Sequence, residues 1–398
     1  MNVPKLRFKD FKDEWTKYKL NDFLDLLTDY DANGSFADMA NNVKTYDNEN
    51  YAWYVRSTDL ENNSPLNKVK YTDKKSYDFL RKTALYGDEV LMAKRGNIGN
   101  VYFFKPKTKY ATLGPNCYLL KTNNKINNYF LYSYFKSTNG YKKLNRLNAS
   151  STLGALYKDD VKNINLTFPE INEQNKIAKT LELLDKKIEL QSKKIEDLKL
   201  FKLYSENKLL NSNDSIYWKK IKLNDILIEG NKEPVKNTNN FKKITIKLNL
   251  NGLEFNESKR ETSDRRPFYI REENEIIIGK QNYFNGSIAI VTKKFSGCIC
   301  SNAIMSFKVK EGYNLKYIYL YLSQKRYMKE REFLANGTGQ KELSEKEFLK
   351  FTIKVPEDSV VKKITNIIEK INKKINFENN KLNKLIELKK GLMQNMFV

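Results

Sequence analysis

The sequence contains no histidine among its 398 residues. Histidine is the commonest general base at neutral pH and the commonest metal ligand, so its absence excludes Ser-His-Asp and Cys-His catalysis and every histidine-containing zinc site. Cysteine is scarce too: Cys117, Cys298 and Cys300 are too few for a disulfide framework or a four-thiolate zinc site. We therefore expect buried, reduced thiols in a cytosolic protein without a metal site.

Long hydrophobic runs are also missing. The longest aliphatic stretches, such as Ile276-Ile277-Ile278, are the length of a strand, far below the roughly 20 residues that a membrane span needs. Residues 1–10 contain no apolar stretch of signal-peptide length. We expect a cytoplasmic protein with no membrane partner.

Motifs that bind nucleotides or carry catalysis are absent as well. There is no Gly-x-x-x-x-Gly-Lys-Ser/Thr loop, no Gly-x-Gly-x-x-Gly and no Asn/Asp-Pro-Pro-Tyr tetrapeptide of a base-flipping amino-methyltransferase. Residues 89–94 and 275–280 imitate a nuclease strand, but no matched Pro-Asp precedes them, and two-metal cleavage needs clustered carboxylates. Asp22 and Asp225 lie in segments typical of a helix start, where capping is the simpler role. We assign no catalytic residue and no cofactor to this chain.

Positive charge is abundant. Lys and Arg total 72 against 48 Asp and Glu, a net charge of +24, which favours a polyanionic partner. Residues 170–210 and 357–397 carry net charges of only +1 and +4, which leaves +19 on the remaining segments. Those segments are therefore the candidates for contact with nucleic acid.

The chain repeats itself, first at an offset of 203 residues and then at 186 to 187. The matching pairs are Trp15–Leu24 with Trp218–Leu227, Asp88–Lys94 with Asn274–Lys280, Gly99 with Gly286, and Phe168–Glu170 with Val355–Glu357. Two copies in one chain indicate an internal pseudo-twofold axis. Because identity between the matched segments is weak, we expect equivalent placement with different recognition surfaces.

Each copy has two parts of different composition. In the first part, β-branched and aromatic runs such as 52–55, 100–104 and 287–291 are broken by Asn and Gly, which predicts strand-rich domains of mixed α/β class. Short helices are expected at 129–134 and 317–322. We divide the chain into a globular domain at 1–168, a helix at 169–211, a second globular domain at 212–355 and a second helix at 356–398.

Apolar residues in the two helical segments alternate at spacings of four and three, which is typical of a coiled coil. The seam residues are Ile177, Leu181, Leu184, Ile188, Ile195 and Leu198 in the first segment and Ile364, Ile368, Ile371, Ile375, Leu382 and Leu385 in the second. Gln191 and Glu378 occupy equivalent seam positions. We expect two helices of about 40 residues, roughly 60 Å each, that pair antiparallel. Packing of each helix on its own domain alone is the alternative.

Basic and amide side chains cluster in both globular domains. The candidates in the first are Arg56, Ser57, Thr58, Lys74, Lys75, Lys94, Arg95, Asn97, Lys142, Lys143 and Arg146. Those in the second are Lys259, Arg260, Arg265, Arg266, Arg271, Lys280, Gln281, Asn282, Tyr283 and Asn285. Arg and Lys pair with guanine or phosphate, and Asn or Gln with adenine. A solvated surface is the alternative for any one cluster, but recurrence in the loops before Gly99 and Gly286 favours contact.

This layout resembles the DNA-specificity subunit of type I restriction-modification enzymes over essentially the whole chain. The matching motifs are Trp15 with Lys19-Leu20, Trp218 with Lys222-Leu223, Gly87–Leu91 with Arg95–Gly99, and Phe168–Ile177 with Leu183–Ile188. The last string is the most specific. The second copy departs from it, with Val360-Val361 in place of Glu173-Gln174 and Asn372 in place of Asp185.

The resemblance implies a non-catalytic reader of a bipartite, asymmetric site in double-stranded DNA. It implies two target-recognition domains separated by paired conserved helices, on which two methyltransferase subunits dock and which motor-nuclease (restriction) subunits join. S-adenosylmethionine, ATP and Mg²⁺ would then belong to those partners. The competing hypotheses are a stand-alone nuclease and an RNA-binding or purely structural coiled-coil protein.

Overall fold

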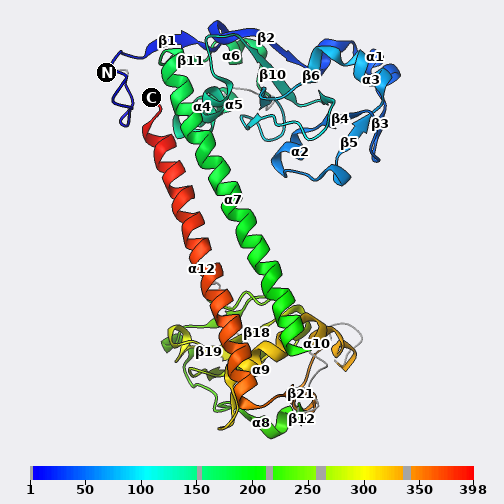
Figure 1. Cartoon of the computed structure of the whole chain (residues 1–398), viewed down its shortest axis with the longest axis vertical. Helices are drawn as coiled ribbons and strands as arrows, with labels where there is room; N and C mark the ends of the chain where they lie inside the picture. Colours follow the sequence, from blue (N-terminus) through cyan, green and yellow to red (C-terminus); the bar gives the residue numbers. More distant parts are fainter. Residues whose placement is uncertain (1–2, 150–154, 212–217, 257–265, 335–341) are drawn as a thin grey trace. The chain divides into compact units, whose positions relative to one another are not determined.

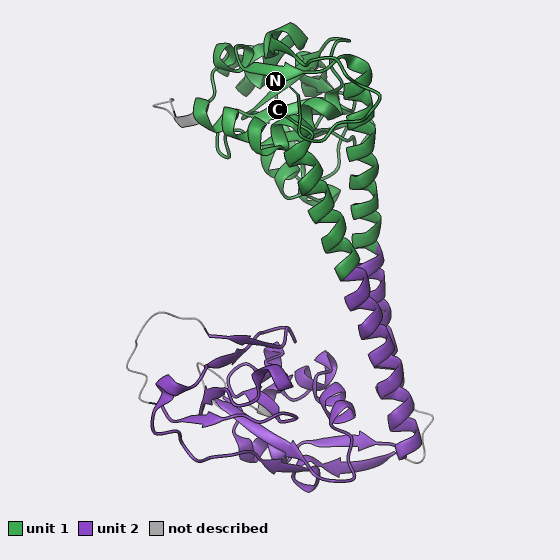
Figure 2. Cartoon of the chain, turned by 90° about the vertical axis from the view of Figure 1, so that its left-hand side faces the viewer, with its two compact units in different colours: residues 1–193, 380–398 green, residues 194–379 purple. Residues whose placement is uncertain are grey.

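The computed structural model describes residues 3–149, 155–211, 218–256, 266–334 and 342–398. The chain forms two compact units, Met1–Lys193 with Asn380–Val398 and Lys194–Asn379, which Figure 2 colours separately. Each unit contains one globule and one end of each of two long helices, α7 (Ile171–Leu210) and α12 (Asp358–Asn395), labelled in Figure 1. The mixed α/β class predicted from the sequence is confirmed.

The first globule is built on three sheets. They are β1 (Thr16–Lys19) with β11 (Asn165–Phe168); β2 (Leu24–Asp29), β10 (Cys117–Thr122), β7 (Val90–Ala93) and β8 (Val101–Phe103) in that order; and β3 (Thr45–Tyr46), β5 (Lys70–Thr72), β4 (Ala52–Val55), β9 (Ala111–Leu113) and β6 (Ala84–Leu85). The helices are α1 (Phe36–Asn42), α2 (Ser57–Glu61), α3 (Lys74–Phe79), α4 (Asn128–Lys136), α5 (Thr138–Ala149) and α6 (Lys158–Lys162).

The second globule repeats two of these sheets. They are β12 (Lys219–Lys222) with β21 (Thr352–Val355), and β13 (Leu227–Glu229), β20 (Ile304–Val309), β17 (Ile276–Gly279) and β18 (Ile288–Ile290) in that order. Two-stranded pairs, β14 (Ile244–Ile246) with β15 (Leu253–Phe255) and β16 (Phe268–Ile270) with β19 (Ile299–Ser301), take the place of the five-stranded sheet. The helices are α8 (Leu223–Ile226), α9 (Leu315–Leu322), α10 (Lys325–Lys329) and α11 (Glu345–Leu349).

The internal repeat is therefore confirmed in the strand order, and the copies diverge in the sheets between the repeated ones. The predicted short helices correspond to α4 and α9, which both begin at an asparagine N-cap: the side chain of Asn127 accepts from Phe130 N and that of Asn314 from Tyr317 N. The segments predicted as strands at 52–55, 100–104 and 287–291 contain β4, β8 and β18.

The two long helices are antiparallel. In the first unit, Lys389 near the end of α12 pairs with Asp185 near the start of α7 at 2.5 Å. In the second unit, Leu210 at the end of α7 shares a core cluster with Val361 and Ile364 near the start of α12. The start of each helix therefore meets the end of the other.

All the predicted seam residues are buried or half-buried. Ile177 and Leu181 lie in the core cluster of the first globule together with Phe130, and Ile364 lies in that of the second. The helices therefore pack on the globules as well as on each other. At the equivalent polar seam positions Gln191 is half-buried, whereas Glu378 is fully buried and paired with Lys194 and Lys374 at 2.9 and 3.0 Å.

The start of α7 is fixed to its globule by two buried polar residues. Arg7 donates from Nε and Nη2 to the two carboxylate oxygens of Glu173, both at 2.8 Å. Gln174 accepts from Asn127 N at 3.0 Å and donates to Pro169 O at 2.9 Å. In α12 the equivalents are Val360-Val361, and Val361 is buried in the core of the second globule. The positions of Glu173 and Gln174 thus anchor a long helix in both copies. In the first copy the contacts are polar, and in the second they are apolar.

The three cysteines are free and buried, as expected. Burial raises the pKa of Cys117 to about 12, and it also raises the pKa of Cys298 and of Cys300. The thiols are therefore protonated at neutral pH. No helix in the described part of the chain has the length and apolar composition needed to cross a membrane.

Candidate nucleic-acid interface

Lys94, predicted to contact DNA, instead forms buried ion pairs within the first globule. It directly follows β7 and is 7% exposed, and its ammonium pairs with Asp29 and Asp31, both at 2.7 Å. Lys158 reaches the other oxygen of Asp29 at 2.9 Å. Two carboxylates therefore neutralise the Lys94 ammonium in this structure, and it is not available to a phosphate.

Arg56 and Lys143 are also engaged locally. Arg56 donates to both oxygens of Asp59, at 3.0 and 2.7 Å, and so holds the first turn of α2. Lys143 Nζ donates to Asn165 O at 2.6 Å, and burial lowers the pKa of its ammonium. Lys74 is exposed and pairs with Asp78 at 2.7 Å, a contact that water and salt weaken.

The remaining candidates of the first globule lie at its surface. Ser57 is half-buried, and the others are exposed: Thr58, Lys75, Arg95, Asn97, Lys142 and Arg146. Arg95 and Asn97, from the loop after β7, are therefore both exposed at the surface.

Asn97 belongs to a polar cluster around Glu61. The Glu61 carboxylate accepts from Asn97 Nδ2 at 2.6 Å, from Asn100 Nδ2 at 3.2 Å and from Tyr102 Oη at 2.9 Å. These bonds, led by the one from Asn97, hold the pKa of Glu61 below its ordinary value. The cluster borders a cavity of about 540 Å³ that is also lined by Trp53 and by lysines. Carboxylates and amides of this kind can hydrogen-bond to base edges.

The predicted residues of the second globule differ in where they lie. Lys259, Arg260 and Arg265 lie outside the described residues. Tyr283 is fully buried, with its hydroxyl donating to Leu322 O at 2.8 Å, so its ring is part of the core. Asn285 is exposed.

Three other predicted residues meet at one cavity of about 400 Å³. Arg266, Gln281 and Asn282 line it, and each is exposed. Gly286 closes the loop that carries Gln281 and Asn282: its φ is 77°, and a Cβ there would lie 3.0 Å from Leu250 N. The glycine therefore lets the loop approach the protein's own backbone, where Leu250 N donates to Gly286 O at 3.0 Å.

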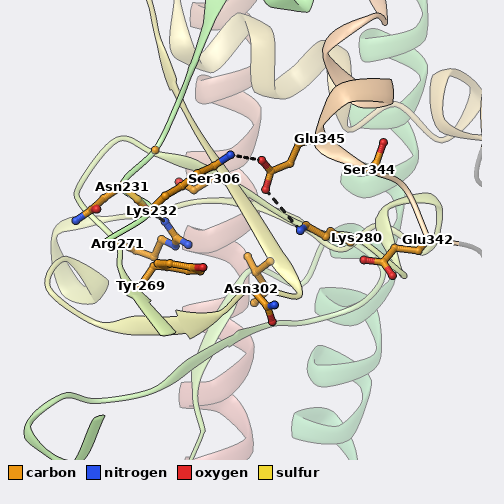
Figure 3. A pocket seen from close by; sticks show the side chains of 12 residues that line it. Asn231, Lys232, Tyr269, Arg271, Lys280, Asn302, Ser306, Glu342, Ser344 and Glu345 are labelled. Carbon is orange, nitrogen blue, oxygen red and sulfur yellow. Dashed lines mark hydrogen bonds and ion pairs between the residues drawn. The ribbon is translucent and has the colours of Figure 1, made fainter. Parts of the chain in front are cut away.

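A second cavity, of about 600 Å³, shares Ile304 with the first in its lining and is lined by Arg271 and Lys280 (Figure 3). Glu345 at the start of α11 binds Lys232 at 2.6 Å and approaches Lys280 at 3.5 Å. Burial raises the pKa of Glu345, but the hydrogen bond and charge of Lys232 and the charge of Lys280 outweigh burial and lower it overall. Two of the predicted residues, Arg271 and Lys280, thus lie in one cavity with Lys232 and Glu345.

Sequence reasoning missed Glu61, Lys232 and Glu345. A search for cations and amides passes over carboxylates, and Lys232 stands alone between two acidic residues in the sequence. The signal that could have found Glu345 is the offset of 187, which aligns it with Lys158 of α6. Among the described residues, no group of three or more Cys, Asp or Glu side chains is placed to hold a metal ion.

Comparison with known proteins identifies the family. The model of the type I restriction modification DNA specificity domain matches twice, at residues 12–200 and 216–388, and the chain belongs to this family. Its fold is similar to the crystal structure of a type I restriction-modification system S subunit from M. genitalium, with a TM-score of 0.60 and 16% identity over 100% of this chain and 99% of that one. A chain from a structure of a type I R-M system, described by its complex assembly and conformational transition, has a TM-score of 0.53 and 13% identity over 95% and 96% of the two chains.

Proposed function

We propose that this chain is the non-catalytic specificity subunit of a type I restriction-modification complex, and that its two globules read the two halves of a bipartite, asymmetric DNA site. The observation that carries the proposal is a family match that occurs twice in a chain whose two copies carry different side chains at equivalent positions. At the offset of 186, Leu85 corresponds to Arg271; at 187, Lys158 corresponds to Glu345. Two globules that share a fold but carry different side chains at equivalent positions can recognise two different half-sites.

Charge and surface chemistry support DNA as the ligand. The globular segments carry +19 of the net charge, which favours a duplex backbone. Arg95 and Asn97 in the first globule, and Arg266, Gln281 and Asn282 in the second, are exposed side chains of the types that read bases in the major groove. We propose these five as the base-reading candidates.

The helices expose apolar side chains that a partner would cover. In the first unit they are Leu183, Leu190, Ile386 and Leu388; in the second they are Leu200, Phe201, Leu203, Tyr204, Ile367 and Phe377. Exposed leucine and phenylalanine on neighbouring helices mark a protein-docking surface. We propose that methyltransferase subunits dock here, and that restriction subunits join the assembly.

The chemistry is assigned to those partners. S-adenosylmethionine for methyl transfer, and ATP with Mg²⁺ for cleavage, would bind to the methyltransferase and restriction subunits. A methyltransferase must take its target base out of the stack, at a cost of a few kcal/mol. This chain's part is then to fix the duplex in register and to favour its deformation.

Mapping methylated DNA tests the proposal. Cells that carry the chain should show one methylated bipartite sequence, which is lost when the gene for the chain is deleted and restored when it is returned. A chain whose second globule is exchanged for that of a relative should keep one half-site and change the other. An unchanged methylation pattern after deletion would contradict the proposal.

The docking surface has its own test. Leu190→Glu should prevent co-purification with the methyltransferase subunit, because a charge would replace an apolar contact. Ser192→Glu places the same charge at an exposed position about 200° around the helix from Leu190, so it is the matched control and should retain the partner. Equal retention by both variants would move the docking site off this face.

A further inference from the structure

Arg271 is a buried cation whose immediate partners are all neutral. Its side chain is 2% exposed, Nε donates to Cys300 Sγ at 3.0 Å, and Nη1 donates to Asn231 O at 3.1 Å. The guanidinium lies 5.4 Å from the ring centre of Tyr269. Burial keeps the thiol of Cys300 protonated, because it raises the pKa. No carboxylate in the described part of the chain forms an ion pair with Arg271.

The buried carboxylate in the same region, Glu275, has one oxygen hydrogen-bonded, Oε2, and one without a hydrogen-bond partner among the described residues, Oε1. Glu275 accepts from Ser306 Oγ at 2.9 Å and from Glu272 N at 3.2 Å, and it forms no ion pair with Arg271. An isolated buried charge is costly unless a partner compensates it. A guanidinium has five N–H donors, and two of those on Arg271 are used here.

The cavity of about 600 Å³ in Figure 3 gives this guanidinium an open side. Its lining includes Gly230, Lys232, Tyr269, Arg271, Lys280 and Glu345. The two lysines share Glu345, and Lys232 also binds Glu229 at 2.6 Å. Glu342 is exposed, and Figure 3 draws it beyond Lys280 as seen from Arg271. The lysines therefore have counterions, and Arg271 is the cation of this lining that lacks one.

The equivalent position in the first globule carries no charge. Leu85 pairs with Ala111, and Arg271 N donates to Cys298 O at the matching place in the second globule. Leu85 is 3% exposed. The corresponding strand pair of the first globule thus accommodates an apolar residue at this position.

We propose that this cavity binds one phosphodiester group of the DNA backbone through Arg271. The inference rests on the proposed function and deepens it by naming a backbone contact of the second globule. A phosphodiester carries a single negative charge, which matches the one cation among the described residues of this lining that has no ion-pair partner, and its two free oxygens match the fork of a guanidinium. Lys280 is placed to add a second donor once the phosphate competes with Glu345.

Salt dependence of duplex binding measures this contact. The full chain and Arg271→Met are titrated with duplex DNA by fluorescence anisotropy from low to moderate salt. Loss of one phosphate contact should lower the slope of log K against log salt by about 0.9, on any duplex sequence. Lys373→Met, which removes an exposed charge from α12, is the control and should keep the slope of the wild type. An unchanged slope for Arg271→Met overturns the inference.

Three further measurements distinguish loss of the contact from loss of folding and DNA from a free anion. Arg271→Leu copies the residue of the first globule, so a melting temperature close to that of the wild type shows that lost binding is not lost folding. Glu345→Gln frees the lysines and should strengthen duplex binding several-fold. Inorganic phosphate, compared with chloride at equal ionic strength, should raise the melting temperature of the wild type and not of Arg271→Met.

The outcomes distinguish the cavity from the wider proposal. If the wild type binds no duplex, the proposed function and this inference fail together. If it binds duplex and the Arg271→Met slope is unchanged, only the cavity contact fails. Tight saturation by inorganic phosphate with unchanged DNA slopes would assign the cavity to a free anion and would also overturn the DNA contact.

Discussion

A lysine follows the central strand in both globules, but its counterions come from different elements. Lys94 after β7 is held by Asp29 at the end of β2 and by Asp31, and Lys158 of α6 shares Asp29. Lys280 after β17 instead approaches Glu345, the α11 residue that aligns with Lys158. The residue at this helix position is thus a cation in the first copy, Lys158, and an anion in the second, Glu345.

The difference also changes exposure. The side chains of Lys94 and Asp29 are 9% and 6% exposed, whereas those of Lys280 and Glu345 are 20% and 22% exposed and border an open cavity. The first network is part of the core, and the second is part of a surface. Repetition of a fold therefore preserves the position of a charge without preserving its role.

Breaking the buried network should have the largest effect. Asp29→Asn leaves the Lys94 ammonium buried with only Asp31, and loss of one partner from a buried ion pair costs about 3 kcal/mol. Urea unfolding in a Trp218→Phe background measures it, because the remaining tryptophans, Trp15 and Trp53, lie in the first unit. A loss below 1 kcal/mol would show that the network is as weak as a surface pair.

Exposed arginines should affect one half-site each. Arg95→Ala is expected to weaken discrimination at one half of the DNA site, and Arg266→Ala at the other, by about 2 kcal/mol each if each reads a base. Mapping of the methylated sequence for each variant measures the change. Equal loss at both halves for either variant would refute the division of labour between the globules.

Acid should weaken the first globule through Asp29. Burial raises the pKa of Asp29, but hydrogen bonds and charges from Lys94 and Lys158 outweigh burial and lower the pKa overall. Because the folded pKa lies below the unfolded value of about 3.9, the stabilisation is full above that value and is lost as pH falls through the folded pKa. Between about pH 5 and 2, the free energy of unfolding should therefore fall less with decreasing pH for Asp29→Asn than for the wild type.

The surface network should matter least for stability. Glu345→Gln removes the partner of two lysines that water can solvate, so the second globule should lose less than about 1 kcal/mol. Hydrogen exchange of the β17 amides, followed by mass spectrometry, reports this locally. If Glu345→Gln reduced protection of the β17 amides as strongly as Asp29→Asn reduces protection of the β7 amides, the two networks would not differ in their contribution to stability.

The helices and the repeat could be predicted because they depend on local pattern. The four-three spacing from Ile177 to Leu198 is a property of one segment, and the offset of the strands after Asp88 and Asn274 needs only comparison along the chain. The burial of Lys94 could not be predicted, since it depends on carboxylates more than 60 residues earlier in the chain. A basic residue close to a glycine has the same appearance in sequence whether its partner is a phosphate or a distant aspartate.

The isolated guanidinium of Arg271 was equally hidden from the sequence. Its context, Tyr269-Ile270-Arg271-Glu272-Glu273, suggests an arginine balanced by neighbouring acids. In the structure, Glu272 instead reaches Lys308 at 2.5 Å and Arg271 turns toward Cys300. Adjacent residues on an extended segment point to opposite sides, so proximity in sequence is a poor guide to pairing there.

The buried thiols make the wild-type chain a ready background for site-directed labelling. Only the thiolate reacts with maleimides, and burial keeps Cys117, Cys298 and Cys300 both inaccessible and protonated. A cysteine placed at the exposed position Leu190 should therefore take up a fluorophore selectively, without removal of the native residues. Such a probe would report, by the change in its emission, when a partner covers the helices.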